Sequence, residues 1–388
     1  MKSLEEFIND GLEKNKEGNC LDSIAKFSCA IEVDPNNAKA YNLRGFSKNK
    51  ITCYSYAIQD FDKALNIDQN FVVVHINKAF AKQMMGLHQL AIDSYSKALE
   101  ISNKETKAYV GRGLSKEKLD DFSGSIEDHT EAIQLNPNDD EPYLFRGISK
   151  EKQGDHQGAI EDFTKALEIN PKYKSAYFFR SNSKKDLKDF AGALEDLSRL
   201  IELEPTRSDF YSFRAHAKSY LEDFSGAITD LEKAIEIQPI YLYFLAAARV
   251  KELVGAHEGA SEFYAQGIKS NVQSRMSYSP RGYLKSHIGN HLGDIEDNER
   301  TIAIERKFSQ STYNVASTDF DIEDFKNAIK CYNMVLETDP NHVPIYFHRG
   351  LAKYYLNQTE EAIIDFEKAV ELGDEKSVAF LEKNTLQT

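Results

Sequence analysis

The segment Ala57-Ile58-Gln59-Asp60-Phe61-Asp62-Lys63-Ala64-Leu65 decides the fold, because related versions of it recur along the whole chain. Residues equivalent to Ala57 follow one another at intervals of 34, with a single interval of 33. They are Ser23, Ala57, Ala91, Ser125, Ala159, Ala193, Ala227, Ala260, Asp294, Ala328 and Ala362. A fixed period of about 20 to 50 residues is the signature of a repeat array. The sequence therefore predicts eleven copies of one structural unit in 388 residues.

Each unit has the composition of two closely packed helices. We number every repeat so that the eleven residues above are position 20. Position 8 is small in all eleven repeats: Gly11, Gly45, Ala79, Gly113, Gly147, Ser181, Ala215, Ala248, Gly282, Ala316 and Gly350. Position 27 is often alanine, as in Ala30, Ala64, Ala98, Ala132, Ala166, Ala234 and Ala369. Small residues at these two positions allow the helices of one repeat to approach each other closely.

Two further positions complete the unit. Position 24 is often aromatic and is expected to fill the core: Phe27, Phe61, Tyr95, Phe163, Tyr264, Tyr332 and Phe366. Six of the nine prolines stand at position 32, where they end the second helix: Pro35, Pro137, Pro171, Pro205, Pro239 and Pro340. The pattern predicts helical hairpins separated by short turns.

These positions resemble the tetratricopeptide repeat, a 34-residue helix-turn-helix unit with a conserved pattern of small, aromatic and late proline residues. The resemblance covers residues 4–376. It implies an all-α solenoid, a right-handed superhelix of hairpins whose concave groove binds a peptide or a partner protein. We expect repeats 1–8 over residues 4–274, repeats 9–11 over 275–376, and a capping helix over 377–388, since terminal repeats must cover an exposed core.

The chain departs from the family by placing charged residues at positions 7 and 23. Seven repeats combine Arg at position 7 with Asp at position 23: Arg44 with Asp60, Arg112 with Asp128, Arg146 with Asp162, Arg180 with Asp196, Arg214 with Asp230, Arg281 with Asp297, and Arg349 with Asp365. The four repeats without the arginine also lack the aspartate, and repeat 1 has Asp10 and Lys26 in reverse. We predict a structural ion pair within each repeat. An anionic ligand is a weaker interpretation, because the aspartates would compete for the arginines.

Lysine occupies position 11 in ten repeats, for example Lys48 and Lys116. We expect its stem to cover apolar neighbours while the ammonium stays in water. The alternative is a basic stripe that binds ligands.

Positions 5 and 9 of the first helices are the candidate binding residues, because this family lines its groove with such positions. The candidates are Phe46, Phe80, Leu114, Leu144, Ile148 and Phe178. A continuous apolar strip would suit an amphipathic helix or an extended peptide. Acidic neighbours such as Glu117, Glu141 and Glu151 favour a ligand with basic residues beside its apolar anchors. The alternative is that these apolar side chains pack against neighbouring helices.

Repeat 9 is irregular, because Pro280 falls inside its expected first helix. We expect that helix to start at Pro280, with Ser279 as its N-cap. We also expect a bend or mobile joint near residues 270–282, with faster hydrogen exchange than in repeats 4 to 7.

The composition and the apolar segments indicate which kinds of partner and which cellular location to expect. A net charge of −14 and an isoelectric point near 5.3 argue against nucleic acid. Apolar runs are far shorter than the roughly 20 residues of a membrane span, and acidic residues interrupt the N-terminal stretch where a signal peptide would be apolar. The four cysteines lack metal-like spacing. We expect a cytoplasmic protein without membrane insertion.

Motifs for catalysis are missing from the sequence. It contains no HExxH, no phosphate-binding glycine loop and no GxSxG. His287 and His291 have the i, i+4 spacing of metal ligands on a helix, which is a weak signal by itself. We therefore predict no catalytic, cofactor-binding or metal-binding residues and expect a non-enzymatic protein.

Three functions remain open on this evidence. The first is a scaffold or adaptor that binds a protein or peptide in the groove. The second is a co-chaperone, although the family's basic clamp is not recognisable, since Lys39 is followed by Leu43 and Lys107 by Gly111 at the required spacing. The third is a regulatory subunit of a larger enzyme complex.

Overall fold

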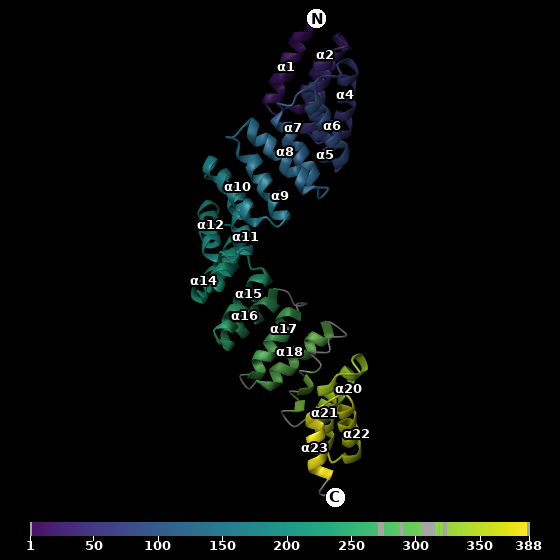
Figure 1. Ribbon diagram of the computed structural model, residues 1–388, viewed down its shortest axis with the longest axis vertical. Helices are drawn as coiled ribbons and strands as arrows, with labels where there is room; N and C mark the ends of the chain where they lie inside the picture. Colours follow the sequence, from purple (N-terminus) through teal and green to yellow (C-terminus); the bar gives the residue numbers. More distant parts are fainter. Residues whose placement is uncertain are drawn as a thin grey trace. The chain divides into compact units, whose positions relative to one another are not determined.

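The computed structural model describes residues 2–270, 275–287, 290–304, 313, 315–317, 319–320 and 324–385. They belong to two compact units, residues 1–203 and 204–388, and each unit is considered by itself. The regular secondary structure of the described residues is helical, and it contains no strand (Figure 1). The predicted all-α solenoid is confirmed. The predicted repeat-group boundaries at 274 and 376 stay predictions.

Consecutive helices alternate as the first and second helix of each repeat. In the first unit they are α1 (Leu4–Lys16), α2 (Cys20–Val33), α3 (Ala38–Lys50), α4 (Tyr54–Ile67), α5 (Val72–Met84), α6 (His88–Ile101), α7 (Thr106–Glu117), α8 (Phe122–Leu135), α9 (Asp140–Lys152), α10 (His156–Ile169), α11 (Lys174–Asp186) and α12 (Phe190–Leu203). In the second unit they are α13 (Ser208–Tyr220), α14 (Phe224–Ile237), α15 (Tyr241–Leu253), α16 (His257–Ser270), α17 (Arg275–His287), α18 (His291–Ile304), α20 (Phe325–Thr338), α21 (Val343–Tyr355), α22 (Thr359–Glu371) and α23 (Glu375–Thr385). None of the helices described is long and apolar enough to cross a membrane.

The helix boundaries follow from local chemistry at positions 15 and 16. An aspartate at position 16 caps several second helices; the Asp155 carboxylate, for example, accepts a hydrogen bond from the Gly158 N–H at 2.9 Å. The residue at position 15 has a left-handed backbone conformation in nine described repeats. Five of the nine are not glycine, with φ between 59° and 63°: Thr52, Asp120, Lys188, Glu222 and Asn357. This conformation costs L-residues roughly 1–2 kcal/mol, so the surrounding packing must impose it.

Packing follows the order of the repeats. Each first helix packs against the second helix of its repeat, and described second helices pack against the next first helix within the same unit. In the first unit, first helices of neighbouring repeats are also in contact. The pairs are α3 with α5, α5 with α7, α7 with α9, and α9 with α11. The first helices therefore lie side by side along one face of this unit. In the second unit, α23 packs against α22, and the ring centroids of Phe380 and Phe366 are 4.5 Å apart.

The two helices of a repeat interlock through positions 8 and 24. A Cβ placed on Gly147 would lie 2.5 Å from Cε1 of Phe163, and one on Gly45 would lie 2.6 Å from Cε1 of Phe61. The phenylalanine rings are fully buried, so they have little room to move. Repeats with Ala or Ser at position 8 have Tyr or Leu at position 24: Ala79 with Tyr95, Ser181 with Leu197, Ala215 with Leu231, Ala248 with Tyr264, and Ala316 with Tyr332. All four phenylalanines at position 24 are faced by a glycine, at Gly11, Gly45, Gly147 and Gly350.

Repeat 9 differs from the expectation that its first helix starts at Pro280. The helix α17 begins at Arg275 and contains Pro280, so that expectation was wrong. The proline forfeits one backbone hydrogen bond. The helix is anchored by Arg281, whose guanidinium carbon lies 5.6 Å from the ring centre of Tyr278 and whose Nη2 lies 2.5 Å from Asp297 Oδ1. Residues 271–274 lie outside the described residues, and the joint proposed near 270–282 stays a prediction.

In repeat 4 a histidine occupies the core position that is phenylalanine or tyrosine in seven other repeats. His129, at position 24 of repeat 4, is fully buried and its ring centroid lies 5.7 Å from that of Phe145. Neither ring nitrogen has a hydrogen-bond partner among the described residues. Burial lowers the pKa of His129 from 6.5 to about 4, because the apolar surroundings disfavour the charged imidazolium.

We predict that Gly147→Ala destabilises the protein by about 1–3 kcal/mol through its clash with Phe163. Ordinarily a Gly→Ala change inside a helix stabilises by roughly 0.5–1 kcal/mol, so the sign of the effect is diagnostic. The double variant Gly147→Ala/Phe163→Leu should recover part of the loss, because repeat 7 already pairs Ala215 with Leu231. Urea unfolding measures all three, with Gly259→Ala as a control whose Cβ has its nearest neighbour at 3.6 Å. A stabilising Gly147→Ala would refute the interlock.

We predict that His129→Phe removes a pH dependence of stability. With a folded pKa of about 4 and an unfolded pKa of 6.5, the unfolded chain binds the proton first as the pH falls. The effect of His129 on the free energy of unfolding therefore appears as the pH falls below 6.5. Between pH 6.5 and 4 this free energy decreases by about 3 kcal/mol in total, and above pH 6.5 it is unaffected by His129. Urea unfolding at pH 7.5 and 5 should show a smaller difference for His129→Phe than for the parent chain. Equal differences would contradict this assignment.

Candidate functional site

The predicted Arg and Asp residues lie together in all seven repeats that contain them. The Arg Nη2 atom is 2.5–2.7 Å from a carboxylate oxygen of the Asp in the same repeat. The Asp side chains are only 3–4% exposed and the Arg side chains 15–20% exposed. Hydrogen bonding to Asp230 raises the pKa of Arg214 above its usual value. The pairs thus join the two helices of one hairpin in a largely buried setting.

Lysine at position 11 completes each of these pairs, which corrects the expectation that its ammonium stays in water. In the same seven repeats its Nζ atom lies 2.7–3.1 Å from the second oxygen of the aspartate. The lysine side chains are 15–20% exposed. A buried carboxylate with two oxygens accepts from two cations better than from one, and this brings the lysine inward. We call Arg, Lys and Asp together the charge triad.

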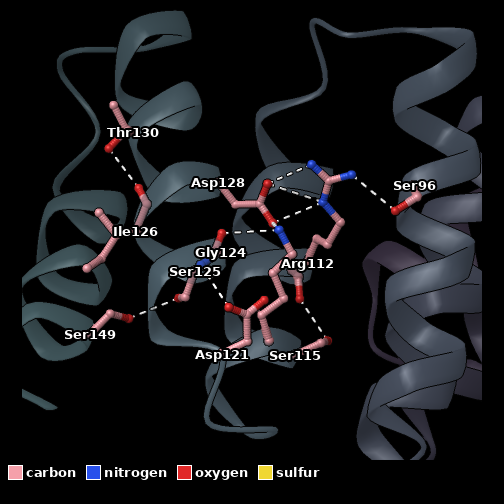
Figure 2. Close-up of polar contacts among 12 residues, drawn as sticks. Ser96, Arg112, Ser115, Asp121, Gly124, Ser125, Ile126, Asp128, Thr130 and Ser149 are labelled. Carbon is pink, nitrogen blue, oxygen red and sulfur yellow. Dashed lines mark hydrogen bonds and ion pairs between the residues drawn. The ribbon is translucent and has the colours of Figure 1, made fainter. Parts of the chain in front are cut away.

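Five of the seven arginines also donate to a side chain of the preceding repeat. Arg112 Nη1 donates to Ser96 Oγ at 3.1 Å, while Nε and Nη2 bind Asp128 (Figure 2). Arg146 makes the same contact with Thr130 Oγ1 at 3.2 Å. A tyrosine at position 4 lies beneath each arginine, with ring centres 5.4–5.8 Å from the guanidinium carbon. Sequence analysis missed both partners, although Tyr at position 4 occurs in those seven repeats and in none of the other four.

These contacts define the chemistry available to the arginines. Their donors are directed at the aspartate and, for Arg44, Arg112, Arg146, Arg180 and Arg349, at the preceding repeat, so the triads serve as internal links of the array. Repeat 1 is looser: Asp10 lies 2.6 Å from Lys2 and 4.0 Å from Lys26.

An apolar pocket of about 810 Å³ opens along the first helices of repeats 2 to 4. Its apolar lining is Phe46 from α3, Ile76 and Phe80 from α5, and Val110 and Leu114 from α7. Phe46 is 39% exposed and Phe80 is 43% exposed, which is unusual for phenylalanine. Polar groups surround this lining: Asn49, Lys50, Asn77, Gln83, Lys107, Asp139 and Glu141. We call this the groove pocket.

The six candidate groove residues therefore separate into two sets. Phe46, Phe80 and Leu114 line the groove pocket. Leu144 does not line it: it is only 4% exposed and belongs to the core around Phe163. Ile148 is half-buried and packs against the same core. Phe178 is half-buried and lies edge-on to Phe179, with centroids 5.6 Å apart.

Acidic side chains continue along the first helices beyond the groove pocket. Glu117 is 13% exposed, and its Oε1 lies 3.8 Å from Lys118 Nζ. Glu151 accepts a hydrogen bond from Ser183 Oγ at 3.2 Å. Burial raises the pKa of both carboxyls, because their negative charges are only partly compensated. A ligand cation placed nearby would restore that compensation.

The second unit has its own pocket of about 520 Å³ between the first helices of repeats 7 and 8. It is lined by Ser212, His216, Tyr220, Leu242, Leu245, Arg249 and Leu253, among others. The rings of His216 and Tyr220 lie edge-on, with centroids 4.9 Å apart. This pocket is smaller and carries a histidine and an arginine, so the two units present different surfaces.

The described part of the chain contains no cluster of side chains that could form a metal-binding site. No group of three or more His, Cys, Asp or Glu side chains there could hold a metal ion. The side chains of His287 and His291 lie outside the described residues.

Family models of the tetratricopeptide repeat match three segments, residues 141–173, 208–241 and 343–372. These coincide with repeats 5, 7 and 11 of the internal period. The chain is 38% identical over 52 residues to the human mitochondrial import receptor subunit TOM70, which covers 13% of this chain and 9% of the relative. It is 32% identical over 74 residues to the STIP1 homolog of Dictyostelium discoideum, which covers 19% and 13%. The alignments thus span a small part of both relatives.

Solved structures with a similar helical arrangement include yeast Tom70, with a TM-score of 0.39 and 15% identity over 99% of this chain and 96% of that one. Another is PilF of Pseudomonas aeruginosa, with a TM-score of 0.49 and 17% identity over 55% of this chain and 97% of that one.

We predict that Asp162→Ala costs about 3–5 kcal/mol of unfolding free energy, because it leaves Arg146 and Lys150 without their carboxylate in a buried site. Arg146→Ala should cost less, because Lys150 still holds Asp162. The exposed pair of Lys165 and Glu168 supplies the control, and Lys165→Ala should leave stability unchanged. Denaturant unfolding compares the three variants. An Asp162→Ala protein as stable as the parent would show that the triads contribute nothing.

Proposed function

Since the chain is a tetratricopeptide-repeat protein, we propose that it is a protein-interaction scaffold that binds a segment of a partner protein in the groove pocket. The observation that carries this proposal is the exposure of Phe46 and Phe80, which sit on neighbouring first helices of the same pocket. The residue at the same position in repeat 5, Ile148, packs against the core around Phe163. The groove pocket therefore leaves uncovered the apolar surface of two phenylalanines on neighbouring helices.

The size of the pocket suits two or three apolar side chains of a ligand. Burying one large apolar side chain contributes roughly 1.5–3 kcal/mol. Three such anchors therefore approach the roughly 8 kcal/mol of a micromolar complex before the entropy of binding is subtracted. A short amphipathic helix or an extended segment meets this requirement.

The polar residues of the pocket favour a ligand of a particular character. Asn77 Oδ1 and Gln83 Nε2 can pair with a ligand backbone, while the other amide atoms of these two residues bind Asn42 and Tyr95. Asp139 and Glu141 stand near the start of α9, where they would attract a basic side chain. With Glu117 and Glu151 further along, these acids support a ligand that carries basic residues beside its apolar anchors.

We predict that Phe80→Ala weakens ligand binding without changing thermal stability. Peptides selected from a displayed random library on the full chain serve as ligands, and their affinities follow from fluorescence polarisation. Losing the contacts of one phenylalanine should raise Kd at least about tenfold. Selected sequences should combine apolar and basic residues.

The matched control is Ile148→Ala, which removes an apolar residue from the core. It should lower Tm and leave the Kd of the selected peptides unchanged. If Phe80→Ala also lowers Tm by as much, Phe80 is a core residue and the groove pocket is not the binding site. Peptides whose Kd is unaffected by Phe80→Ala would place binding elsewhere.

A further inference from the structure

Repeat 3 retains the cations of the charge triad without its carboxylate. Lys78 stands at position 7, Lys82 at position 11, and Ser94 replaces the aspartate at position 23. In the seven complete triads, the position 11 lysine lies 2.7–3.1 Å from an aspartate oxygen. Ser94 is shorter and uncharged, so it cannot take that role.

The two lysines of repeat 3 differ in the partners that they find. Lys82 Nζ donates to Ser94 Oγ at 2.9 Å and to the Leu90 carbonyl at 3.3 Å, both of which are neutral. Among the described residues, no carboxylate oxygen lies within 4.0 Å of Lys82 Nζ. Lys78 pairs instead with Asp62 of the preceding repeat, at 2.5 Å. Burial, followed by the nearby charge of Lys78, lowers the pKa of Lys82, as expected for a cation whose charge is poorly compensated.

A cleft of about 670 Å³ opens where the carboxylate is missing. It lies between α4 and α6 and includes three residues of α5, namely His75, Lys78 and Lys82. Lys97 of α6 adds a third lysine to the cleft, and it too has no carboxylate partner within the described structure. The cleft also contains Asp62, Asp93 and Glu100, while His75 Nε2 is hydrogen-bonded to the Gln69 carbonyl at 2.9 Å.

The other incomplete repeats do not leave this arrangement. Repeat 8 has Ala247 and Phe263 at positions 7 and 23, so the retained Lys251 has no neighbouring cation at position 7. Repeat 10 has Val315 and Cys331, and repeat 1 supplies its own acid at position 7. Repeat 3 is therefore the repeat whose sequence keeps two cations for one absent carboxylate.

We propose that this cleft is a carboxylate-binding site, occupied by an acidic side chain of a partner protein in the place that aspartate takes in the complete triads. Lys82 and Lys97 would donate to the bound carboxylate. A doubly charged phosphate is disfavoured, because Asp62, Asp93 and Glu100 share the cleft and would repel it more strongly.

The site is distinct from the groove pocket, although both use α5. The groove pocket takes Ile76, Phe80 and Gln83, whereas the carboxylate cleft takes His75, Lys78 and Lys82. Residues spaced by three and four positions share a face of a helix, so the two sets lie on different faces of α5. A failure of one site therefore leaves the other untouched.

Sodium acetate and sodium phosphate, titrated at constant ionic strength against the full chain, test the proposal by amide NMR. We expect saturable shifts at Lys82 and Ser94 with acetate, with a Kd in roughly the millimolar range, and weaker binding of phosphate. Ser94→Asp supplies the missing carboxylate internally and should weaken acetate binding at least about tenfold while raising Tm.

Lys97→Gln provides a second variant at an exposed position and should also weaken acetate binding. Its matched control is Lys63→Gln, because Lys63 occupies the same position 26 in repeat 2 and lies outside the cleft lining. Shifts that fail to saturate, or that persist unchanged in Ser94→Asp and Lys97→Gln, would overturn the site. Phosphate binding about tenfold tighter than acetate binding would overturn the assignment to a carboxylate.

Discussion

The contact between positions 8 and 24 sets the distance between the two helices of a repeat, and the remaining interactions depend on that distance. Gly147 and Phe163 leave no room for a methyl group on the glycine. In repeat 7 the larger Ala215 is instead combined with the smaller Leu231. Interiors are packed nearly as densely as organic crystals, so a change on one side requires a change on the other. His129 occupies this position in repeat 4, where a buried ring without hydrogen bonds fills the space of a phenylalanine.

The charge triads are a consequence of this close approach. An arginine on the first helix can reach an aspartate on the second with two parallel hydrogen bonds only when the helices are held at a constant distance. Buried ions are costly to leave unpaired, so the arginine and the aspartate of a triad are present or absent together. Tyr at position 4, Arg at position 7 and Asp at position 23 accordingly occur in the same seven repeats. Repeat 3 lacks all three of these residues but keeps two lysines, Lys78 and Lys82, beside Ser94.

The helix α5 brings the two proposed binding surfaces together. One face contributes apolar side chains to the groove pocket, and another contributes lysines to the carboxylate cleft. A partner could engage either surface alone or both at once. Engagement of both would combine apolar burial, which supplies affinity, with charge pairing, which supplies orientation. Both surfaces belong to the first unit, and the pocket of the second unit has a different lining.

The sequence by itself determined the period, the helical hairpin and the matched occurrence of Arg and Asp, because eleven copies in one chain reveal which residues vary together. The tertiary structure decided which apolar residues are exposed. Phe80 and Ile148 occupy the same position in repeats 3 and 5, yet Phe80 lines a pocket while Ile148 packs against a core. It also showed that Lys48 and its equivalents bind the aspartates instead of pointing into water. Finally, it showed that α17 begins at Arg275 and continues through Pro280. Periodicity reports contacts within one repeat, whereas the exposure of a side chain depends on the residues that the neighbouring repeats place against it.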